Sequence, residues 1–164
     1  LPEAQMDRFI MKVVLDYPDP DSERQMLAML RGESRQDAGA DSAPLTQEAL
    51  FACRADIDRV HVSEALDQYL VDLVNATRHP AGQDADLARW IQVGASPRGA
   101  IALDKVARAH AWLSGQDYAS PDDVRSVARP VLRHRLHLSY DAVADGVSAD
   151  QVIDKLLDTV AVPA

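Results

Sequence analysis

The stretch Gly94-Ala-Ser-Pro-Arg-Gly-Ala-Ile-Ala-Leu-Asp-Lys-Val-Ala-Arg-Ala-His-Ala-Trp-Leu-Ser-Gly115 decides the fold of this chain. Ser96 is a favoured N-cap residue, and Pro97 suits the first turn of a helix, where its missing N–H is not needed. Gly115 is a typical stop signal. We therefore predict a long helix from Ser96 to Gly115. Apolar residues available for a core are Ile101, Leu103, Val106, Ala109 and Leu113.

Helical signals continue on both sides of this stretch, as capping residues followed by apolar residues at three- and four-residue intervals. Together with the long helix, the predicted set covers residues 19–32, 46–58, 63–79, 96–115, 120–136 and 148–160. Pro130 lies inside one of these helices and should kink it. The segments Glu33–Pro44 and His79–Trp90 lack this periodicity and are predicted to be irregular, the second with a short helical turn near its end. We expect an all-α bundle of about six helices.

The N-terminal segment has a different pattern. Residues 3–8 suit the end of a short helix, and the β-branched residues of Ile10–Leu15 predict a strand of about six residues, the only good strand in the sequence. A single strand cannot satisfy its own backbone hydrogen bonds. This segment must therefore pair with residues outside this chain or lie exposed.

The formal net charge of −9 narrows the function classes. Binding to nucleic acid or to an anionic membrane needs a basic patch, so we expect neither. One local exception is a row of arginines, Arg125, Arg129, Arg133 and Arg135, whose spacing favours a solvated helix face. No run of about eighteen apolar residues predicts a membrane span. A single cysteine, Cys53, is typical of a reducing compartment, and we expect a cytoplasmic protein.

Histidines raise the question of a metal site. His134 and His137 are three residues apart on a predicted helix, with Asp141 nearby, which is close to the spacing of helical metal ligands. No tight motif supplies a third ligand, so no metal site is expected. A hydrolase triad through Ser139 is weaker still, because no nucleophile elbow accompanies it.

Arg98 is the leading candidate for a functional residue. The N-terminus of a helix carries partial positive charge, so an arginine in the first turn is disfavoured by about 0.3 to 1 kcal/mol. It calls for a compensating anion or for solvation. An anion would meet the Arg98 guanidinium together with the backbone amides that follow Ser96, a combination that suits phosphate oxygens. From the residues alone, a phosphate site and a solvated arginine both remain open.

Several motifs together resemble one protein family. Gly94–Arg98 is followed by an alanine-rich helix, then by Asp117-Tyr-Ala-Ser-Pro-Asp-Asp-Val124 and Val131-Leu-Arg-His-Arg-Leu136. This order is similar to that of the lid subdomain of MoxR-type AAA+ ATPases. The resemblance implies that Arg98 is the sensor 2 arginine, which reaches the γ-phosphate of ATP held by the same subunit. It places Ser96 and Pro97 beside that nucleotide.

The first residues, Leu1-Pro-Glu-Ala-Gln-Met-Asp-Arg-Phe9, resemble the segment that follows sensor 1 in the same family. The resemblance implies that Arg8 is the arginine finger, which enters the neighbouring subunit's site and neutralises charge on the transferred phosphoryl oxygens. Without the resemblance, pairing of Arg8 with Asp7 or Glu3 would be preferred. The resemblance also implies that residues 1–18 are the end of an αβα ATPase core and that 19–164 form the helical lid.

The resemblance has implications for the whole protein. It implies ATP and Mg²⁺ as cofactors, a homo-oligomeric, hexameric ring, and a chaperone-like role in assembly or activation. It also implies a partner protein with a von Willebrand factor A domain. The chain contains no glycine-rich phosphate loop, no acidic Walker B strand and no sensor 1 asparagine. We therefore expect the chain by itself to be inactive and to bind nucleotide weakly, although the complete protein would be an ATP hydrolase.

Two alternatives remain open. One is a magnesium-chelatase-like AAA+ subunit, which shares the Asp-Arg-Phe type of finger segment. The other is a helical protein-interaction module without a nucleotide role. In such a module Ile10–Leu15 would be disordered or swapped, and Arg98 would contribute only surface charge.

Overall fold

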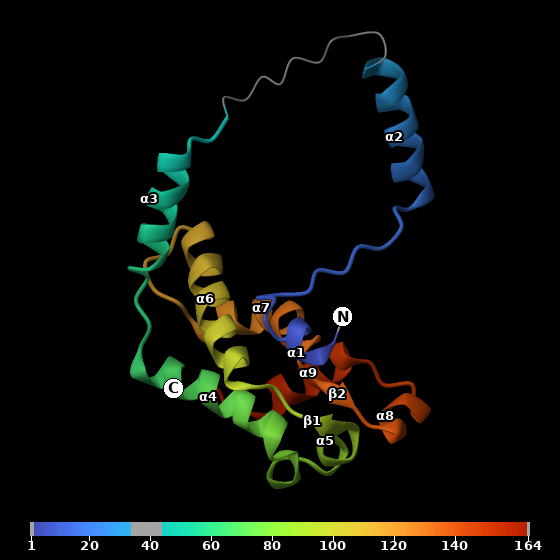
Figure 1. Cartoon of the computed structure of the whole chain (residues 1–164), viewed down its shortest axis with the longest axis vertical. Coiled ribbons are helices and arrows are strands. Elements are labelled where there is room, and N and C mark those ends of the chain that lie inside the picture. Colours follow the sequence, from blue (N-terminus) through green and yellow to red (C-terminus); the bar gives the residue numbers. More distant parts are fainter. Residues whose placement is uncertain (1, 34–43, 164) are drawn as a thin grey trace. The chain divides into compact units, whose positions relative to one another are not determined.

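The computed structural model describes residues 2–33 and 44–163, and it confirms the predicted helical fold class. These residues form nine α-helices, one short 3₁₀ helix and one two-stranded sheet (Figure 1). Most of the segment Glu33–Pro44, predicted to be irregular, lies outside the described residues. Within the described ranges, every helix is too short or too polar to cross a membrane.

The chain divides into two compact units by its internal contacts. One unit comprises Leu1–Val13 with Cys53–Ala164, and the other comprises Val14–Ala52. The predicted division between residues 18 and 19 rests on family resemblance rather than on contacts, and it stays a prediction.

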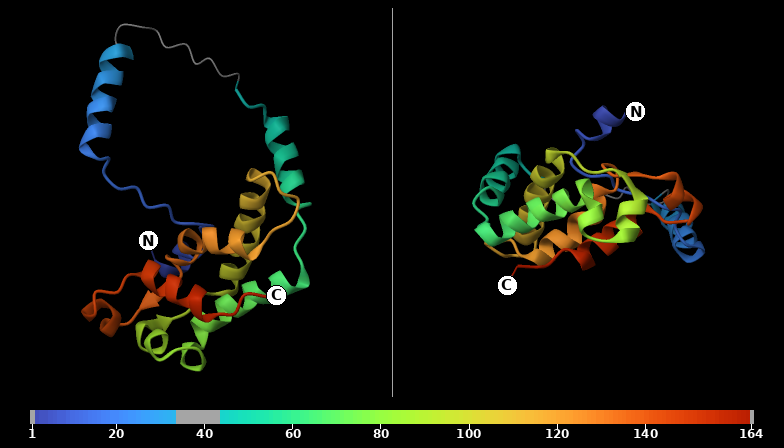
Figure 2. Two further views of the ribbon diagram at one scale, coloured as in Figure 1. Left: turned by 180° about the vertical axis from the view of Figure 1, so that it is seen from behind. Right: turned by 90° about the horizontal axis from the view of Figure 1, so that it is seen from below.

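Four helices form the core of the larger unit: α4 Glu64–Arg78, α6 Pro97–Leu113, α7 Pro121–Leu132 and α9 Ala149–Thr159. α6 packs most extensively on α7; α4 contacts both of these helices, and α9 contacts α4 and α7 (Figures 1 and 2). The core side chains are mainly Leu, Val, Ile and Ala. Shorter elements complete the unit: α1 Glu3–Met6, the end of α3 Gln47–Ile57, the 3₁₀ helix η1 Pro80–Gly82, α5 Ala85–Trp90, β1 Ile91–Val93, β2 His137–Leu138 and α8 Tyr140–Ala144.

α6 faces the core with mostly small residues: Gly99, Ala102, Leu103, Ala107 and Ala111. Burial of Leu103 was predicted correctly. The prediction of Ile101 and Leu113 as core residues was wrong, because they are 55% and 77% exposed. Small side chains let the backbone of α7 approach closely, so the buried side of α6 is its least bulky side. Hydrophobicity alone does not identify such a face.

α7 begins with a capping box that also joins it to α6. Asp123 Oδ2 accepts a hydrogen bond from Ser120 N (2.8 Å), and Asp123 Oδ1 lies 2.7 Å from His110 Nδ1 on α6. Burial tends to raise the pKa of Asp123, but hydrogen bonds from the Ser120 hydroxyl and from His110 hold it below its usual range. The ionised carboxylate is therefore the form that the fold stabilises.

The predicted strand at Ile10–Leu15 does not form within the described residues. One backbone hydrogen bond holds this segment to α7, from Lys12 N to Pro130 O (2.8 Å). Val13 and Leu15 are 66% and 90% exposed. β-branched residues favour extended backbone, but a strand also needs a neighbouring strand, and none lies beside this segment in the described parts of the chain.

The sheet instead joins two segments that sequence patterns did not identify as strands. β1 pairs antiparallel with β2, with Ile91 opposite Leu138 and Val93 opposite His137. Strands of three and two residues are too short to show a period-two pattern. The pairing joins the segment after α5 to the segment before α8, and it brings the end of α7 near the start of α6.

The smaller unit, considered by itself, contains α2 Pro20–Glu33 and the beginning of α3. Asp19 caps α2 by accepting hydrogen bonds from the Asp21 and Ser22 amides. The large apolar residues of this helix are more than half exposed: Met26, Leu27, Met29 and Leu30. Local signals therefore define the helix, and the described residues of this unit do not cover its apolar side.

We expect Asp123→Ala to lower the free energy of unfolding by about 1 to 3 kcal/mol at pH 7, because it removes the capping box and leaves His110 without its partner. Because the pKa of Asp123 is lower in the folded than in the unfolded state, its carboxylate stabilises the fold at neutral pH. This stabilisation is lost as the pH falls through the folded-state pKa. The difference from wild type should therefore narrow below about pH 4. Urea denaturation across this pH range measures both effects.

Asp122→Ala is the matched control, since Asp122 is an exposed acid in the same helical turn. Its cost should be about 0.5 kcal/mol or less. Equal losses in the two variants would contradict a specific role for the Asp123 carboxylate.

Candidate functional site

The Gly94–Gly99 motif is fastened to the end of α4. Ala95 N donates a hydrogen bond to Thr77 Oγ1 (2.9 Å), and Arg78 Nε donates one to Ala95 O (2.7 Å). No side chain fits at Gly94, because a Cβ there would lie 2.6 Å from the carbonyl carbon of Thr77. Glycine thus permits the close approach that fixes where α6 begins.

The start of α6 binds a carboxylate. Ser96 is the N-cap residue; its Oγ accepts from Arg98 N (3.2 Å) and donates to Asp7 Oδ2 (2.8 Å). The Arg98 guanidinium lies 3.3 Å from the same oxygen, and its side chain is 58% exposed. The compensating anion for Arg98, which the sequence left open, is Asp7 in this structure.

Asp7 is shared by two arginines. Its Oδ2 faces Ser96 and Arg98, while its Oδ1 lies 3.3 Å from Arg135 Nε. Burial tends to raise the pKa of Asp7, but the Ser96 and Arg98 hydrogen bonds and the charge of Arg135 hold it below its usual range. Asp7 is therefore ionised at neutral pH. From the sequence, Asp7 was expected only as a possible partner for Arg8, and its contacts with Ser96, Arg98 and Arg135 were missed.

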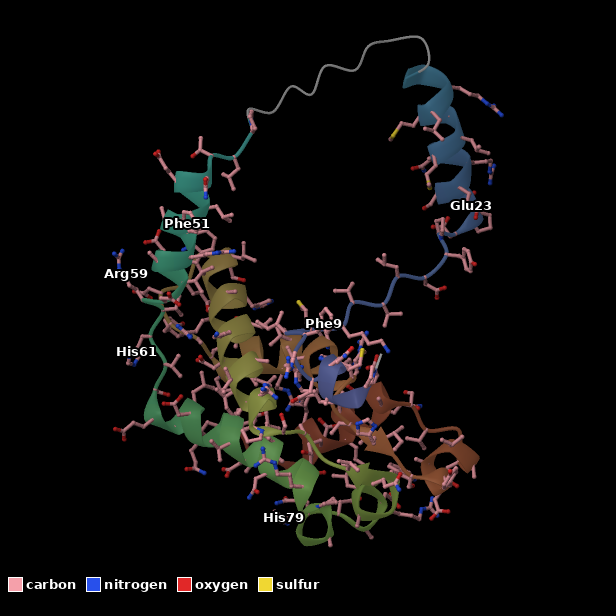
Figure 3. All side chains as sticks on the ribbon, viewed as in Figure 1. Phe9, Glu23, Phe51, Arg59, His61 and His79 are labelled. Atoms are coloured by element: carbon pink, nitrogen blue, oxygen red, sulfur yellow. The ribbon has the colours of Figure 1, made fainter. Side chains whose placement is uncertain are left out.

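Arg135 is buried and holds the backbone around Arg8. Its guanidinium donates to Phe9 O (2.6 Å) and Ile10 O (3.2 Å), and Nη2 reaches Asp7 O at 3.4 Å. Figure 3 labels Phe9 beside the end of α7. The side chain of Arg135 is 2% exposed. Burial lowers the pKa of Arg135, and the neighbouring Asp7 carboxylate opposes that effect.

The predicted solvated face of α7 is therefore wrong for Arg135. The other three arginines of the row pair with acids at or near α9: Arg125 with Asp158, Arg129 with Asp154 and Arg133 with Asp150. α7 ends at Leu132, and the chain then turns. Arg135 follows Arg133 by two residues, whereas the other three arginines are four residues apart, so even a continuous helix would place Arg135 on a different side. It points toward the N-terminal segment instead of α9.

Arg8 and Arg98 line one partly open cavity of about 280 Å³. The full lining is Asp7, Arg8, Ile10, Arg98, Ile101, Ala102, Lys105 and Arg135. Four of these side chains are cationic and one is anionic, so the cavity has excess positive charge at neutral pH. Arg8 is exposed and has no ion pair among the described side chains. The arrangement can accept an anion with several oxygens, such as a phosphate group.

The two histidines considered for a metal site have other surroundings. His134 Nε2 lies 3.0 Å from Phe9 O, and burial is the main cause that lowers the pKa of His134. His134 is therefore neutral at pH 7. In residues 2–33 and 44–163, no group of three or more His, Cys, Asp or Glu could hold a metal ion.

The fold and this site define a class of protein: residues 84–156 match the AAA lid domain family. The whole chain is similar to longer proteins. It is 40% identical to "Chaperone MoxR1" of Mycobacterium tuberculosis, over 99% of this chain and 42% of that protein. It is 36% identical to "Protein MoxR" of Paracoccus denitrificans, over 100% of this chain and 51% of that protein.

A solved structure agrees with these matches. The crystal structure of a Cytophaga hutchinsonii protein assigned as an ATPase superimposes with a TM-score of 0.90 at 38% identity, covering 100% of this chain and 49% of that one. The chain belongs to the MoxR family of AAA+ proteins and includes its lid domain. It spans about half the length of the relatives that it matches.

We expect Gly94→Ala to lower the free energy of unfolding by about 1 to 3 kcal/mol, because the new Cβ meets the rigid backbone of α4 and not a movable side chain. Gly82→Ala is the matched control, since nothing lies within 4 Å of a Cβ at that position. Its change should stay within about 0.5 kcal/mol. Thermal unfolding of the two variants and wild type measures the difference, and similar losses would contradict the close approach.

Proposed function

We propose that this chain is the lid-bearing part of a MoxR-family ATPase that binds ATP with Mg²⁺, in which Arg98 acts as sensor 2 and Arg8 as the arginine finger. The observation that carries the proposal is the shared cationic cavity, which holds both arginines. Residues 1–18 would then belong with the nucleotide-binding core and residues 19–164 with the lid.

The chemistry needs little from the chain beyond well-placed positive charge. Negative charge spreads over the phosphoryl oxygens during transfer, and planar guanidinium groups stabilise it through paired hydrogen bonds. Ser96 would contribute its position at the start of α6, where backbone amides and the helix dipole favour an anion. Pro97 fixes the first turn of that helix.

Nucleotide must displace Asp7 from Arg98 for this role. The contact consists of a 3.3 Å approach by one guanidinium nitrogen, and the Arg98 side chain is 58% exposed. Ion pairs that are exposed to this extent contribute only about 0 to 1 kcal/mol, so a phosphate group can compete with the carboxylate. Ser96 keeps Asp7 in place when Arg98 leaves.

The shared cavity also bears on which nucleotide the arginines reach. The resemblance assigns Arg98 to the nucleotide of its own subunit and Arg8 to that of the neighbouring subunit. Because both line one cavity within one compact unit, a single phosphate group is a simpler target for both. We propose that Arg98 departs from the same-subunit role that the resemblance implies for sensor 2, and that both arginines act on the neighbouring subunit's nucleotide.

The wider proposal follows the family. The chain would work in a homo-oligomeric, hexameric ring in the cytoplasm and assist the assembly or activation of a partner with a von Willebrand factor A domain. The relative named "Chaperone MoxR1" supports a chaperone-like role. Nucleic acid is not an expected partner, because the formal net charge is −9.

We expect Arg98→Ala to lower steady-state ATP turnover of the complete ATPase at least about tenfold, or about 1.4 kcal/mol of transition-state stabilisation. Arg59→Ala is the matched control, because Arg59 is an exposed arginine whose ion pair is local. It should leave turnover unchanged. Equal turnover for Arg98→Ala and wild type would favour the interaction module without a nucleotide role.

A mixing experiment identifies the subunit on which Arg98 acts. Arg98→Ala protein, whose turnover alone is low, is mixed with an inactive variant whose phosphate-binding loop is disrupted. If Arg98 acts across the interface, a site is active when an Arg98→Ala subunit supplies the intact loop and a loop-deficient neighbour supplies Arg98. In an equal random mixture about a quarter of the interfaces have this arrangement, so about a quarter of wild-type turnover should be recovered. No recovery would assign Arg98 to its own subunit's nucleotide. Arg8→Ala, mixed in the same way, is the positive control for the finger role.

A further inference from the structure

We infer that Arg135 is the positioning residue for Arg8: it fixes the backbone on both sides of the finger and couples the finger to the lid. This inference rests on the proposed role of Arg8 in ATP hydrolysis. Arg135 itself would not touch nucleotide; it would act through the segment that it holds.

The contacts of Arg135 bracket Arg8. The guanidinium donates to the carbonyl oxygen of Phe9 at 2.6 Å and approaches that of Asp7 at 3.4 Å, the residues immediately after and before Arg8. A third hydrogen bond reaches Ile10 O at 3.2 Å. Because the peptide units on both sides are held, the direction in which Arg8 leaves the backbone is restricted.

The other end of this connection is fixed to the lid. Arg135 Nη1 also donates to Val131 O in the last turn of α7, and His134 Nε2 lies 3.0 Å from Phe9 O. The Asp7 carboxylate lies between Arg135 and the Ser96–Arg98 turn of α6. The finger segment is therefore bound to the ends of both central lid helices, and movement of the lid would move Arg8.

Apolar packing contributes little to this docking. Taken as whole residues, Phe9 and Ile10 are 55% and 47% exposed, whereas Arg135 is 5% exposed. Burial of a guanidinium is costly unless its donors are satisfied; here backbone carbonyls accept from Nη1 and Nη2, and the Asp7 carboxylate balances the charge at 3.3 Å from Nε. Arginine suits the position because its planar fork presents donors in several directions, which a lysine ammonium does not.

The test is a double-mutant cycle in the complete ATPase with Arg8→Ala, Arg135→Gln and the double variant, measured as kcat and KM for ATP. Arg8→Ala should lower kcat about 10³-fold or more, as an arginine finger does. Arg135→Gln should lower kcat at least about tenfold with KM unchanged. The double variant should be no slower than Arg8→Ala, because Arg135 acts only through Arg8.

Arg129→Gln is the matched control. Arg129 also belongs to the arginine row of α7 and is ion-paired, but its partner is Asp154 and it does not contact residues 7–10. It should leave kcat unchanged. If Arg135→Gln does not fold or assemble, Arg135→Lys replaces it in the same cycle, since lysine keeps the charge but loses the bracketing hydrogen bonds.

The outcomes separate the inference from the proposed function. A normal kcat for Arg8→Ala would overturn the finger role and, with it, the inference. A slow Arg8→Ala with an unchanged Arg135 variant would overturn the inference alone. Losses that multiply in the double variant would also overturn it, because they would mean that Arg135 acts independently of Arg8.

Discussion

α6 and α7 pack antiparallel along a seam of small side chains, and this seam places the part of the candidate site that the two helices supply. Alanines on α6 permit the close approach. At one end of the seam, His110 meets Asp123; at the other, Gly99 lies against Leu132. Because the helices run in opposite directions, the start of α6 and the end of α7 are neighbours. Arg98 and Arg135 are brought together for this reason.

Charge pairing then distinguishes this end of the seam from the rest of the molecule. The chain carries nine more formal negative charges than positive ones. Along α7 and α9, arginines and aspartates pair one to one. At the cavity, by contrast, four cationic side chains and one carboxylate, that of Asp7, line the same space. Local excess of positive charge therefore arises from the arrangement of the helix ends, in spite of the acidic composition.

The candidate site could be predicted only in part. Arg98 was identifiable because an arginine in the first turn of a helix conflicts with the helix dipole, and Ser96 was identifiable as its cap. Arg8 was identified by family resemblance alone. Asp7 and Arg135 were missed, because no local pattern marks a carboxylate that bridges two arginines. Arg135 was grouped with three other arginines, although it follows Arg133 by two residues instead of four and lies beyond the end of α7 at Leu132.

The sequence by itself determined the helices of this protein, since capping residues, prolines, glycines and apolar spacing act over one or two turns. It also carried the motifs of the MoxR family. Tertiary structure decided which face of α6 is buried, that Ile10–Leu15 finds no partner strand, and that two short segments pair as β1 and β2. It also joined Asp7 to Arg135, which are 128 positions apart. Contacts over such separations depend on how whole helices pack, and local sequence signals do not contain that information.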